Sequence, residues 1–151
     1  MKRREFIAAA ASLALAPGAL RAQDNPIAPI DLRDPDVQSV TKGAPIRAGR
    51  VKLELPPLAD NGNSVAMKLT VESPMTVQDH VRAVHLFSER NPVRHMAAFY
   101  LGPKSGRAEI DSRIRLAGSQ KIIALAEMSD GSFWAGSASV VVTLSACLDE
   151  S

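Results

Sequence analysis

The sequence has one cysteine among 151 residues, few aromatic side chains and a single long apolar run. A lone cysteine excludes an internal disulfide, so Cys147 is either buried or available to another molecule. Aromatic residues make up 4% of the chain, and no basic stripe is interleaved with them. We therefore expect no nucleic-acid binding. The apolar run lies within residues 1–22, so we expect no membrane span after that segment is removed.

Residues 1–22 have the pattern of an export signal. Arg3 and Arg4 precede an alanine-rich apolar stretch, and small residues follow at a position suited to cleavage. The paired arginines followed by Phe6-Ile7 favour a twin-arginine signal, which a receptor reads during export of folded proteins. A general secretory signal that starts with basic residues is the alternative.

The basic character of the whole chain comes from this signal. The sequence has 18 Lys and Arg against 16 Asp and Glu, and residues 1–22 contain four of the bases and one of the acids. The remaining chain then carries 14 bases and 15 acids, a net charge of −1. Its 129 residues are enough for one domain with its own core.

A polar, proline-containing leader is expected at residues 23–46. Within it, Asp34 is suited to cap a helix and Pro35 to occupy its first position, which predicts a short helix. A leader without regular structure is the alternative.

Residues 47–146 have the pattern of an all-β domain. Apolar and polar side chains alternate in several segments, as in strands with one buried face. Turn residues such as Asp60-Asn61-Gly62-Asn63 and Asp130-Gly131 separate the segments. Seven short strands without a long helix predict an immunoglobulin-like antiparallel β-sandwich.

Few residues point to catalysis or to a metal. His80 and His85 are five residues apart, so on one unbroken strand their side chains would lie on opposite faces. Neither a Gly-x-Ser-x-Gly elbow nor a metal-ligand motif occurs in the sequence. We expect no metal, no cofactor and no enzyme activity of its own. Trp134 is either a core aromatic after a hairpin turn or a contact with a partner protein.

Cys147 is the candidate functional residue. It lies four residues before the last residue of the sequence, where a side chain is usually exposed. A thiolate is both a nucleophile and a leaving group, so it could accept and release sulfur-containing groups. Residue type alone leaves an inert thiol open. A Cys147–Cys147 linked dimer that senses redox state is a further alternative.

Several segments together resemble the SoxY sulfur-carrier proteins of bacterial thiosulfate oxidation. The strongest similarity is Ala124-Leu125-Ala126-Glu127-Met128-Ser129-Asp130-Gly131-Ser132-Phe133-Trp134. The other segments are residues 55–65, 71–76, 84–92 and 114–117. The resemblance covers roughly residues 45–147.

The resemblance implies a function in the periplasm. It implies an immunoglobulin-like sandwich that forms a heterodimer with a second sandwich protein, SoxZ. It also implies a mobile C-terminal arm whose cysteine, here Cys147, carries the sulfur substrate covalently. A heme-containing protein would load the arm, and other sulfur-oxidation enzymes would act on the attached group.

The C-terminal segment departs from the family pattern. The family's arm normally ends in Gly-Gly-Cys-Gly-Gly, whereas residues 144–151 contain no glycine. We therefore expect a signal at 1–22, a leader at 23–46, a SoxY-like sandwich at 47–146 and a cysteine-bearing tail at 147–151. The expected function is a periplasmic sulfur carrier subunit. The alternative is a binding or scaffold module that pairs with a SoxZ-like protein and makes no use of the cysteine.

Overall fold

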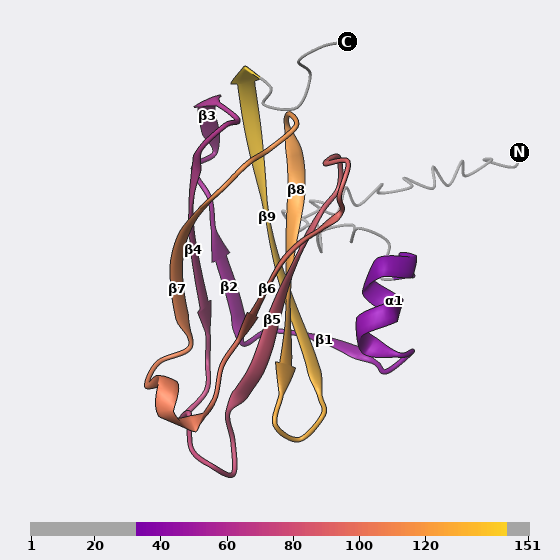
Figure 1. Ribbon diagram of the computed structural model, residues 1–151, viewed down its shortest axis with the longest axis vertical. Helices are drawn as coiled ribbons and strands as arrows, with labels where there is room; N and C mark the ends of the chain where they lie inside the picture. The colour runs from indigo at the N-terminus through magenta and orange to yellow at the C-terminus, as the bar shows by residue number, and fades with distance from the viewer. Residues whose placement is uncertain (1–32, 145–151) are drawn as a thin grey trace, which may run out of the picture.

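The computed structural model describes residues 33–144 as two β-sheets packed face to face, with one α-helix outside them (Figure 1). The elements in chain order are α1 Pro35–Thr41, β1 Ile46–Ala48, β2 Val51–Glu54, β3 Leu58–Asn61, β4 Val65–Val71, β5 Val81–Ser88, β6 His95–Tyr100, a 3₁₀ turn η1 Pro103–Ser105, β7 Glu109–Ile114, β8 Gln120–Met128 and β9 Phe133–Leu144. The all-β sandwich predicted from the alternating pattern is confirmed.

The two sheets differ in size. The larger has the strand order β1-β9-β8-β5-β6, with β3 also paired to β9, and the smaller has the order β2-β4-β7. Strand β4 follows the expected alternation, since Val65, Met67, Leu69 and Val71 are buried. These side chains face the larger sheet and form the main core with residues such as Leu86 and Ile122.

Strand β9 organises one side of the larger sheet. It pairs antiparallel with β8 along most of its length. Its other edge pairs parallel with β1 near its beginning and parallel with β3 near its end. The sequence predicts an antiparallel sandwich of seven strands. The two extra strands are short segments of the chain that return to the same edge of β9, and alternation over three or four residues does not reveal them.

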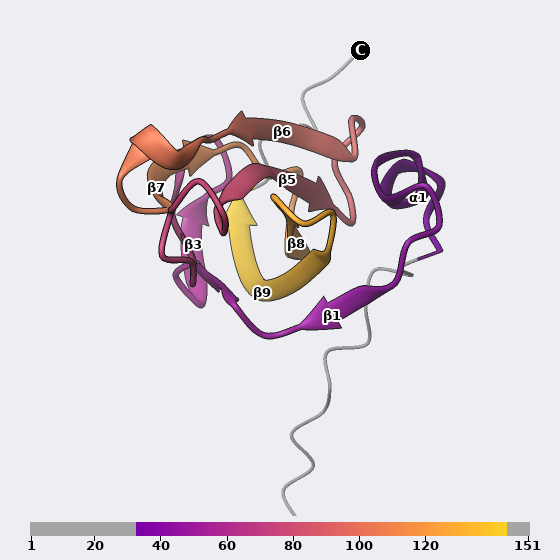
Figure 2. The same cartoon turned by 90° about the horizontal axis from the view of Figure 1, so that it is seen from below.

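Helix α1 forms where Asp34 and Pro35 predict a helix, and it packs outside the larger sheet (Figure 2). The Asp34 side chain accepts a hydrogen bond from the Asp36 backbone N–H at 2.9 Å, which caps the first turn. Val37 is fully buried on the outer face of the sheet. It belongs to a second apolar cluster with Phe87, Ile123, Leu125 and Phe133. Both faces of the larger sheet are therefore covered along β8.

Candidate functional site

Strand β9 ends at Leu144, the last residue that the structure describes. The Leu144 carbonyl oxygen accepts a hydrogen bond from the Gly62 backbone N–H at 2.8 Å. The Gly62 carbonyl in turn accepts from the Leu116 N–H at 2.8 Å. Gly62, in the turn after β3, thus links the last described residue to the turn after β7. Cys147, the predicted attachment site, lies outside the described residues, three positions after Leu144, and so do Arg3 and Arg4 of the predicted signal.

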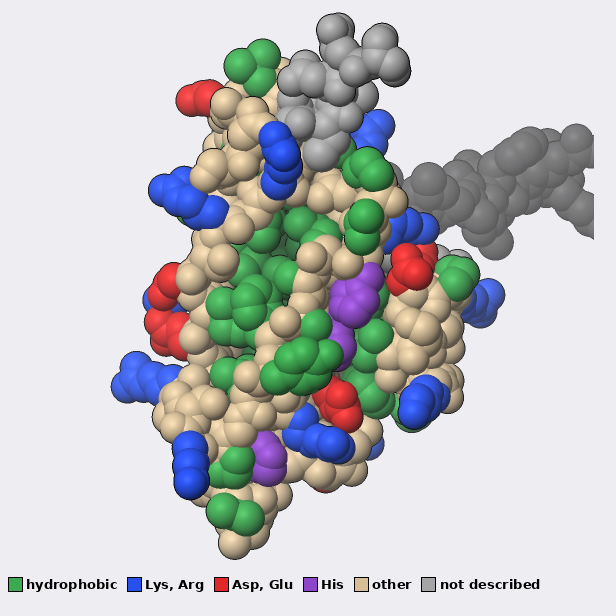
Figure 3. Space-filling model, viewed as in Figure 1, with side chains coloured by type: hydrophobic (Ala, Val, Ile, Leu, Met, Phe, Trp, Pro, Cys, Tyr) green, Lys and Arg blue, Asp and Glu red, His purple; other side chains and the backbone are tan. Residues whose placement is uncertain are grey.

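An apolar groove lies on one face of the sandwich. It has a volume of about 410 Å³ and lies between β6 and β7. Figure 3 shows hydrophobic side chains gathered in a hollow on this face of the molecule. We call it the β6–β7 groove; its apolar lining includes Val93, Met96, Phe99 and Ile114.

The groove exists because the sandwich is open on this side. Among the described strands, β6 pairs only with β5 and β7 pairs only with β4. Each sheet therefore ends in a strand with one unpaired edge, and the core side chains between the two edges stay accessible. Phe99 is only half-buried, although it packs against the main core.

Two arginines lie on the rim of the groove. Arg115 donates through Nη2 to the Asn63 side-chain oxygen at 2.8 Å. Arg113 donates through Nη1 to the Ser64 hydroxyl at 3.3 Å. Their acceptors belong to the turn that follows Gly62, and none of the ion pairs among the described residues includes either guanidinium. Neither guanidinium therefore has an ion-pair partner among the described residues.

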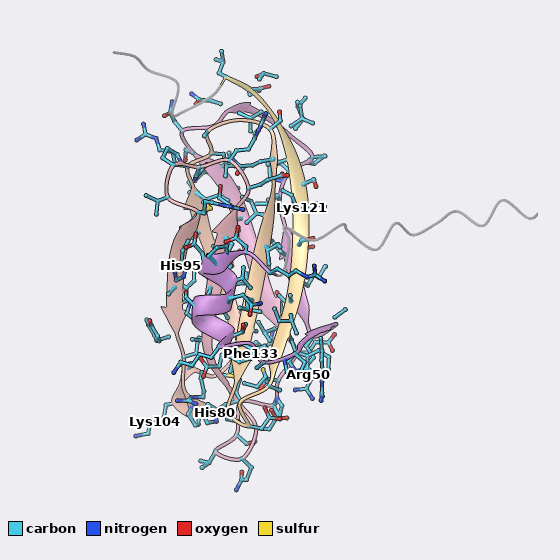
Figure 4. All side chains as sticks on the ribbon, turned by 90° about the vertical axis from the view of Figure 1, so that its right-hand side faces the viewer. Arg50, His80, His95, Lys104, Lys121 and Phe133 are labelled. Atoms are coloured by element: carbon cyan, nitrogen blue, oxygen red, sulfur yellow. The ribbon has the colours of Figure 1, made fainter. Side chains whose placement is uncertain are left out.

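In the structure, two of the three histidines form a pair and the third lies apart. His85 Nδ1 lies 3.1 Å from His95 Nε2, and the His95 ring stacks on Phe87 with centroids 4.8 Å apart. Burial lowers the pKa of His85, and the neighbouring His95 lowers it further. His80 lies apart from His95, toward the other end of the molecule (Figure 4). It contacts the Thr76 carbonyl oxygen at 3.0 Å.

Sequence reasoning compared His80 with His85 and missed the pair that the fold forms. His85 is on β5 and His95 is on the neighbouring strand β6, where a β-bulge shifts the pairing register between Leu86 and Phe87. The bulge that brings the rings together has no signal in the alternation of apolar and polar residues. Within residues 33–144, no three metal-ligating side chains come together to hold an ion.

Trp134 is half-buried on β9 and packs against the main core. The guanidinium carbons of Arg47 and Arg50 lie 5.7 and 5.0 Å from the centre of its ring, within cation–π range. Its Nε1–H donates to the Ser132 hydroxyl at 3.2 Å. Ser132 in turn donates to Asp130, which lowers the pKa of that carboxyl group. Trp134 thus packs on the core as one of the two alternatives predicts, although it is only half-buried. The predicted contact with a partner protein stays a prediction.

The described part of the chain has no helix whose length and apolar content suit a bilayer crossing. A comparison with curated proteins gives no match.

Comparison with solved structures finds several similar folds. The sulfur carrier protein SoxY from Chlorobium limicola f thiosulfatophilum aligns with a TM-score of 0.60 and 19% identity, covering 72% of this chain and 94% of that one. A superoxide reductase (neelaredoxin) from Ignicoccus hospitalis aligns at 0.55 with 15% identity over 62% and 80%. A putative superoxide reductase from Thermotoga maritima aligns at 0.53 with 20% identity over 68% and 89%. At these identities the likeness concerns the fold.

The family comparison is more specific than the fold. A model of one family, described as sulfur oxidation protein SoxY, matches residues 37–147, which include most of α1, all nine strands of the described residues and Cys147. Because this match spans well over half of the sequence, the chain belongs to the SoxY family.

Proposed function

We propose that this protein is a sulfur carrier, and that it holds intermediates of sulfur oxidation on the Cys147 thiol. The observation that carries the proposal is the extent of the family match, which ends at the only cysteine of the chain. The similar fold of a protein named as a sulfur carrier supports it. The protein is then a carrier subunit, and partner enzymes perform the catalysis.

The place where β9 ends suits this role. Leu144 is held at one end of the sandwich, and its side chain is 64% exposed. Three residues of extended chain reach about 10 Å, so Cys147 can extend that far beyond the last described residue. A thiol on such a tether can enter the cleft of another protein while the sandwich stays outside.

The loading step must release two electrons. The Cys147 thiol loses one proton, the thiol and the thiosulfate dianion together lose two electrons, and a sulfur–sulfur bond forms between the cysteine and the outer sulfur of thiosulfate. The product is a cysteine S-thiosulfonate. We propose that a heme-containing partner, as the family resemblance implies, accepts the two electrons. Other sulfur-oxidation enzymes then act on the bound group.

The experiment is the intact mass of the protein from cells that oxidise thiosulfate. We expect a fraction with a thiosulfate-derived or sulfane adduct, which reduction with a thiol removes. The Cys147→Ser variant should lack the adduct. An unmodified mass in the wild-type protein under these conditions would contradict the carrier role and favour a scaffold that pairs with a SoxZ-like protein.

The proposal includes a location and a partner. Residues 1–22, with Arg3 and Arg4, would direct export to the periplasm by the twin-arginine route. Replacing both arginines by lysine should leave the protein in the cytoplasm, which cell fractionation would detect.

The proposed partner is a SoxZ-like β-sandwich protein in a heterodimer, with Trp134 as a contact. The side chain is half-buried on β9, and two arginines lie within cation–π range of its ring. Trp134→Phe keeps most of the packing and should weaken partner binding in a titration by calorimetry. Equal affinity for the variant and the wild-type protein would place the contact elsewhere.

A further inference from the structure

The His85–His95 pair joins two neighbouring strands at the edge of the larger sheet. His85 lies on β5 and His95 on β6, and Nδ1 of the first ring is 3.1 Å from Nε2 of the second. Among the described strands, β6 pairs only with β5, so this edge strand is held from one side. The pair is therefore a cross-strand contact where the larger sheet has least support.

The surrounding structure holds both rings in place. A β-bulge shifts the pairing of β5 with β6, and a bulge re-aims the side chains beside it. The His95 ring stacks on Phe87, which is fully buried, at a centroid distance of 4.8 Å and an interplanar angle of 21°. His85 is buried, whereas His95 is half-buried, and Figure 3 shows histidine at the surface of this face. The pair is thus ordered by packing and still open to a small ligand.

The spacing of the two rings suits a shared metal ion. Imidazole nitrogens bind Zn²⁺ at roughly 2.0–2.1 Å, so two of them on a tetrahedral ion lie about 3.3 Å apart, with ring centres about 5.2 Å apart. The observed distance between the centroids of His85 and His95 is 5.2 Å. The two nitrogens need to separate by only ~0.2 Å from their observed distance to reach that geometry. Both strands can therefore stay where they are when an ion enters.

The electrostatic surroundings admit a cation. Burial and the neighbouring imidazole both lower the pKa of His85, so at neutral pH its ring is uncharged and has a lone pair for a metal. The carboxylate of Glu127 acts in the opposite direction on this pKa, which means that it favours positive charge beside the ring. Arg94 pairs with Asp34, and Arg82 pairs with Glu127. Both arginines close to the pair in sequence are thus matched by a carboxylate.

We propose that His85 and His95 together bind one divalent transition-metal ion of the class of Zn²⁺ and Cu²⁺. Imidazole suits both ions, and the general order of affinities places Cu²⁺ above Zn²⁺. No third metal-ligating side chain joins the pair within residues 33–144, so water completes the coordination. The ring that donates the hydrogen bond changes to its other tautomer when the ion enters, and no net proton is released.

The ion fastens the edge strand β6 to β5. This role goes beyond the proposed carrier function, because it uses neither Cys147 nor sulfur chemistry. A ligand that binds only the folded protein stabilises it, and here the gain concerns a strand that lacks a second neighbour among the described strands.

Calorimetric titration with Zn²⁺ tests the site. The full chain is used as Cys147→Ser and without an affinity tag, because a thiolate is itself a zinc ligand. We expect one ion per chain and a loss of affinity of at least ~10-fold in His85→Gln and in His95→Gln, because removing a group that merely supports a ligand already costs that much. His80→Gln is the matched control, since His80 contacts the Thr76 carbonyl oxygen instead, and it should bind as tightly as the parent protein.

A second measurement locates the ion. Cu²⁺ at less than one equivalent should broaden the NMR signals of the Ala98 and Leu125 amides, which lie opposite His85 on the two neighbouring strands. Signals around Thr76, next to His80, should stay sharp. Zn²⁺ should also slow hydrogen exchange of the β6 amides that bond to β5, because a fastened edge strand opens less often.

The half-buried position of His95 keeps the test independent of folding. A His95→Gln spectrum with the dispersion of the parent protein shows that the fold is kept, so its loss of affinity is then a loss of a ligand. Absence of binding and of broadening in the parent protein would show that the two rings form a hydrogen bond only, and would overturn the proposal. Affinity that survives in either variant would contradict a shared ion. An adduct on Cys147 in cells bears on neither result, so the carrier role and the metal site stand or fall separately.

Discussion

Ser88 and Gln120 are joined by a buried hydrogen bond between neighbouring strands of the larger sheet, with 2.6 Å between the Ser88 hydroxyl and Gln120 Oε1. The same Gln120 oxygen accepts from the Arg90 N–H, and its amide nitrogen donates to the Asn91 side chain at 3.0 Å. Asn91 also donates to the Arg115 carbonyl at 2.8 Å. One buried side chain therefore ties the loop after β5 to the rim of the β6–β7 groove.

We expect Gln120→Ala to destabilise the fold by about 1–3 kcal/mol, because it leaves buried polar groups without partners. The free energy of unfolding from urea titration measures the loss. Gln78→Ala is the control, since Gln78 is exposed, and it should change stability little. Equal stability of the Gln120 variant and the wild-type protein would show that water replaces these contacts.

Asp34 connects helix α1 to the sheet in two ways. It caps the helix and forms an ion pair with Arg94, although its side chain is only 7% exposed. We expect Asp34→Ala to lose about 1–2 kcal/mol of stability, the larger part of it from the cap. Asp34→Asn keeps a capping side chain and loses only the charge. Its free energy of unfolding from urea titration should therefore lie between those of the wild-type protein and Asp34→Ala. If Asp34→Asn were as unstable as Asp34→Ala, the ion pair would dominate.

Gly136 allows the two sheets to approach closely. A Cβ atom at this position would lie 2.3 Å from the Val51 carbonyl oxygen on β2. We expect Gly136→Ala to cost about 1–3 kcal/mol, because backbone must move to relieve the overlap. Thermal unfolding should register it as a lower midpoint. Gly102→Ala is the matched control, since a Cβ there meets nothing within 4 Å.

The pH dependence of stability should report the His85–His95 pair. Burial lowers the pKa of His85 below its ordinary value of 6.5, so the unfolded chain binds this proton more readily than the folded protein. Stability from this group is present above pH 6.5 and is lost as pH falls through the lowered pKa. Glu127 acts weakly in the opposite direction.

We expect His85→Gln to flatten the decrease in unfolding free energy below about pH 6.5, as followed by urea titration at several pH values. His80→Gln should keep the decrease, because His80 lies outside the pair. A wild-type slope in the His85 variant would assign the acid sensitivity to other groups.

The sandwich could be predicted from segments in which apolar and polar residues alternate, and β4 shows that alternation most clearly. In β4 the apolar side chains at 65, 67, 69 and 71 are all buried. Capping chemistry located α1 equally well, since Asp34 and Pro35 have few other local uses. Both the alternation in β4 and the cap of α1 depend only on residues close together in the sequence, so they could be recognised without knowing the fold.

What sequence reasoning missed depends on pairing between distant segments. Ile46 of β1 and Leu58 of β3 pair with Phe133 and Val141 of the same strand, which no local pattern indicates. The groove exists because β6 and β7 have no further neighbour among the described strands, and a missing strand has no sequence signal. Cys147 could be identified as the candidate residue from the sequence alone, because it is the only cysteine of the chain.

The parallel pairing of β3 with the end of β9 also determines how the domain resists mechanical force. A pull on the segment after Leu144 acts along β9, across the hydrogen bonds to β3 and β8. Those bonds then carry the load together in shear, whereas a strand pulled sideways would lose them one at a time. An enzyme could therefore tug on a captured tail without peeling the strand from which it extends.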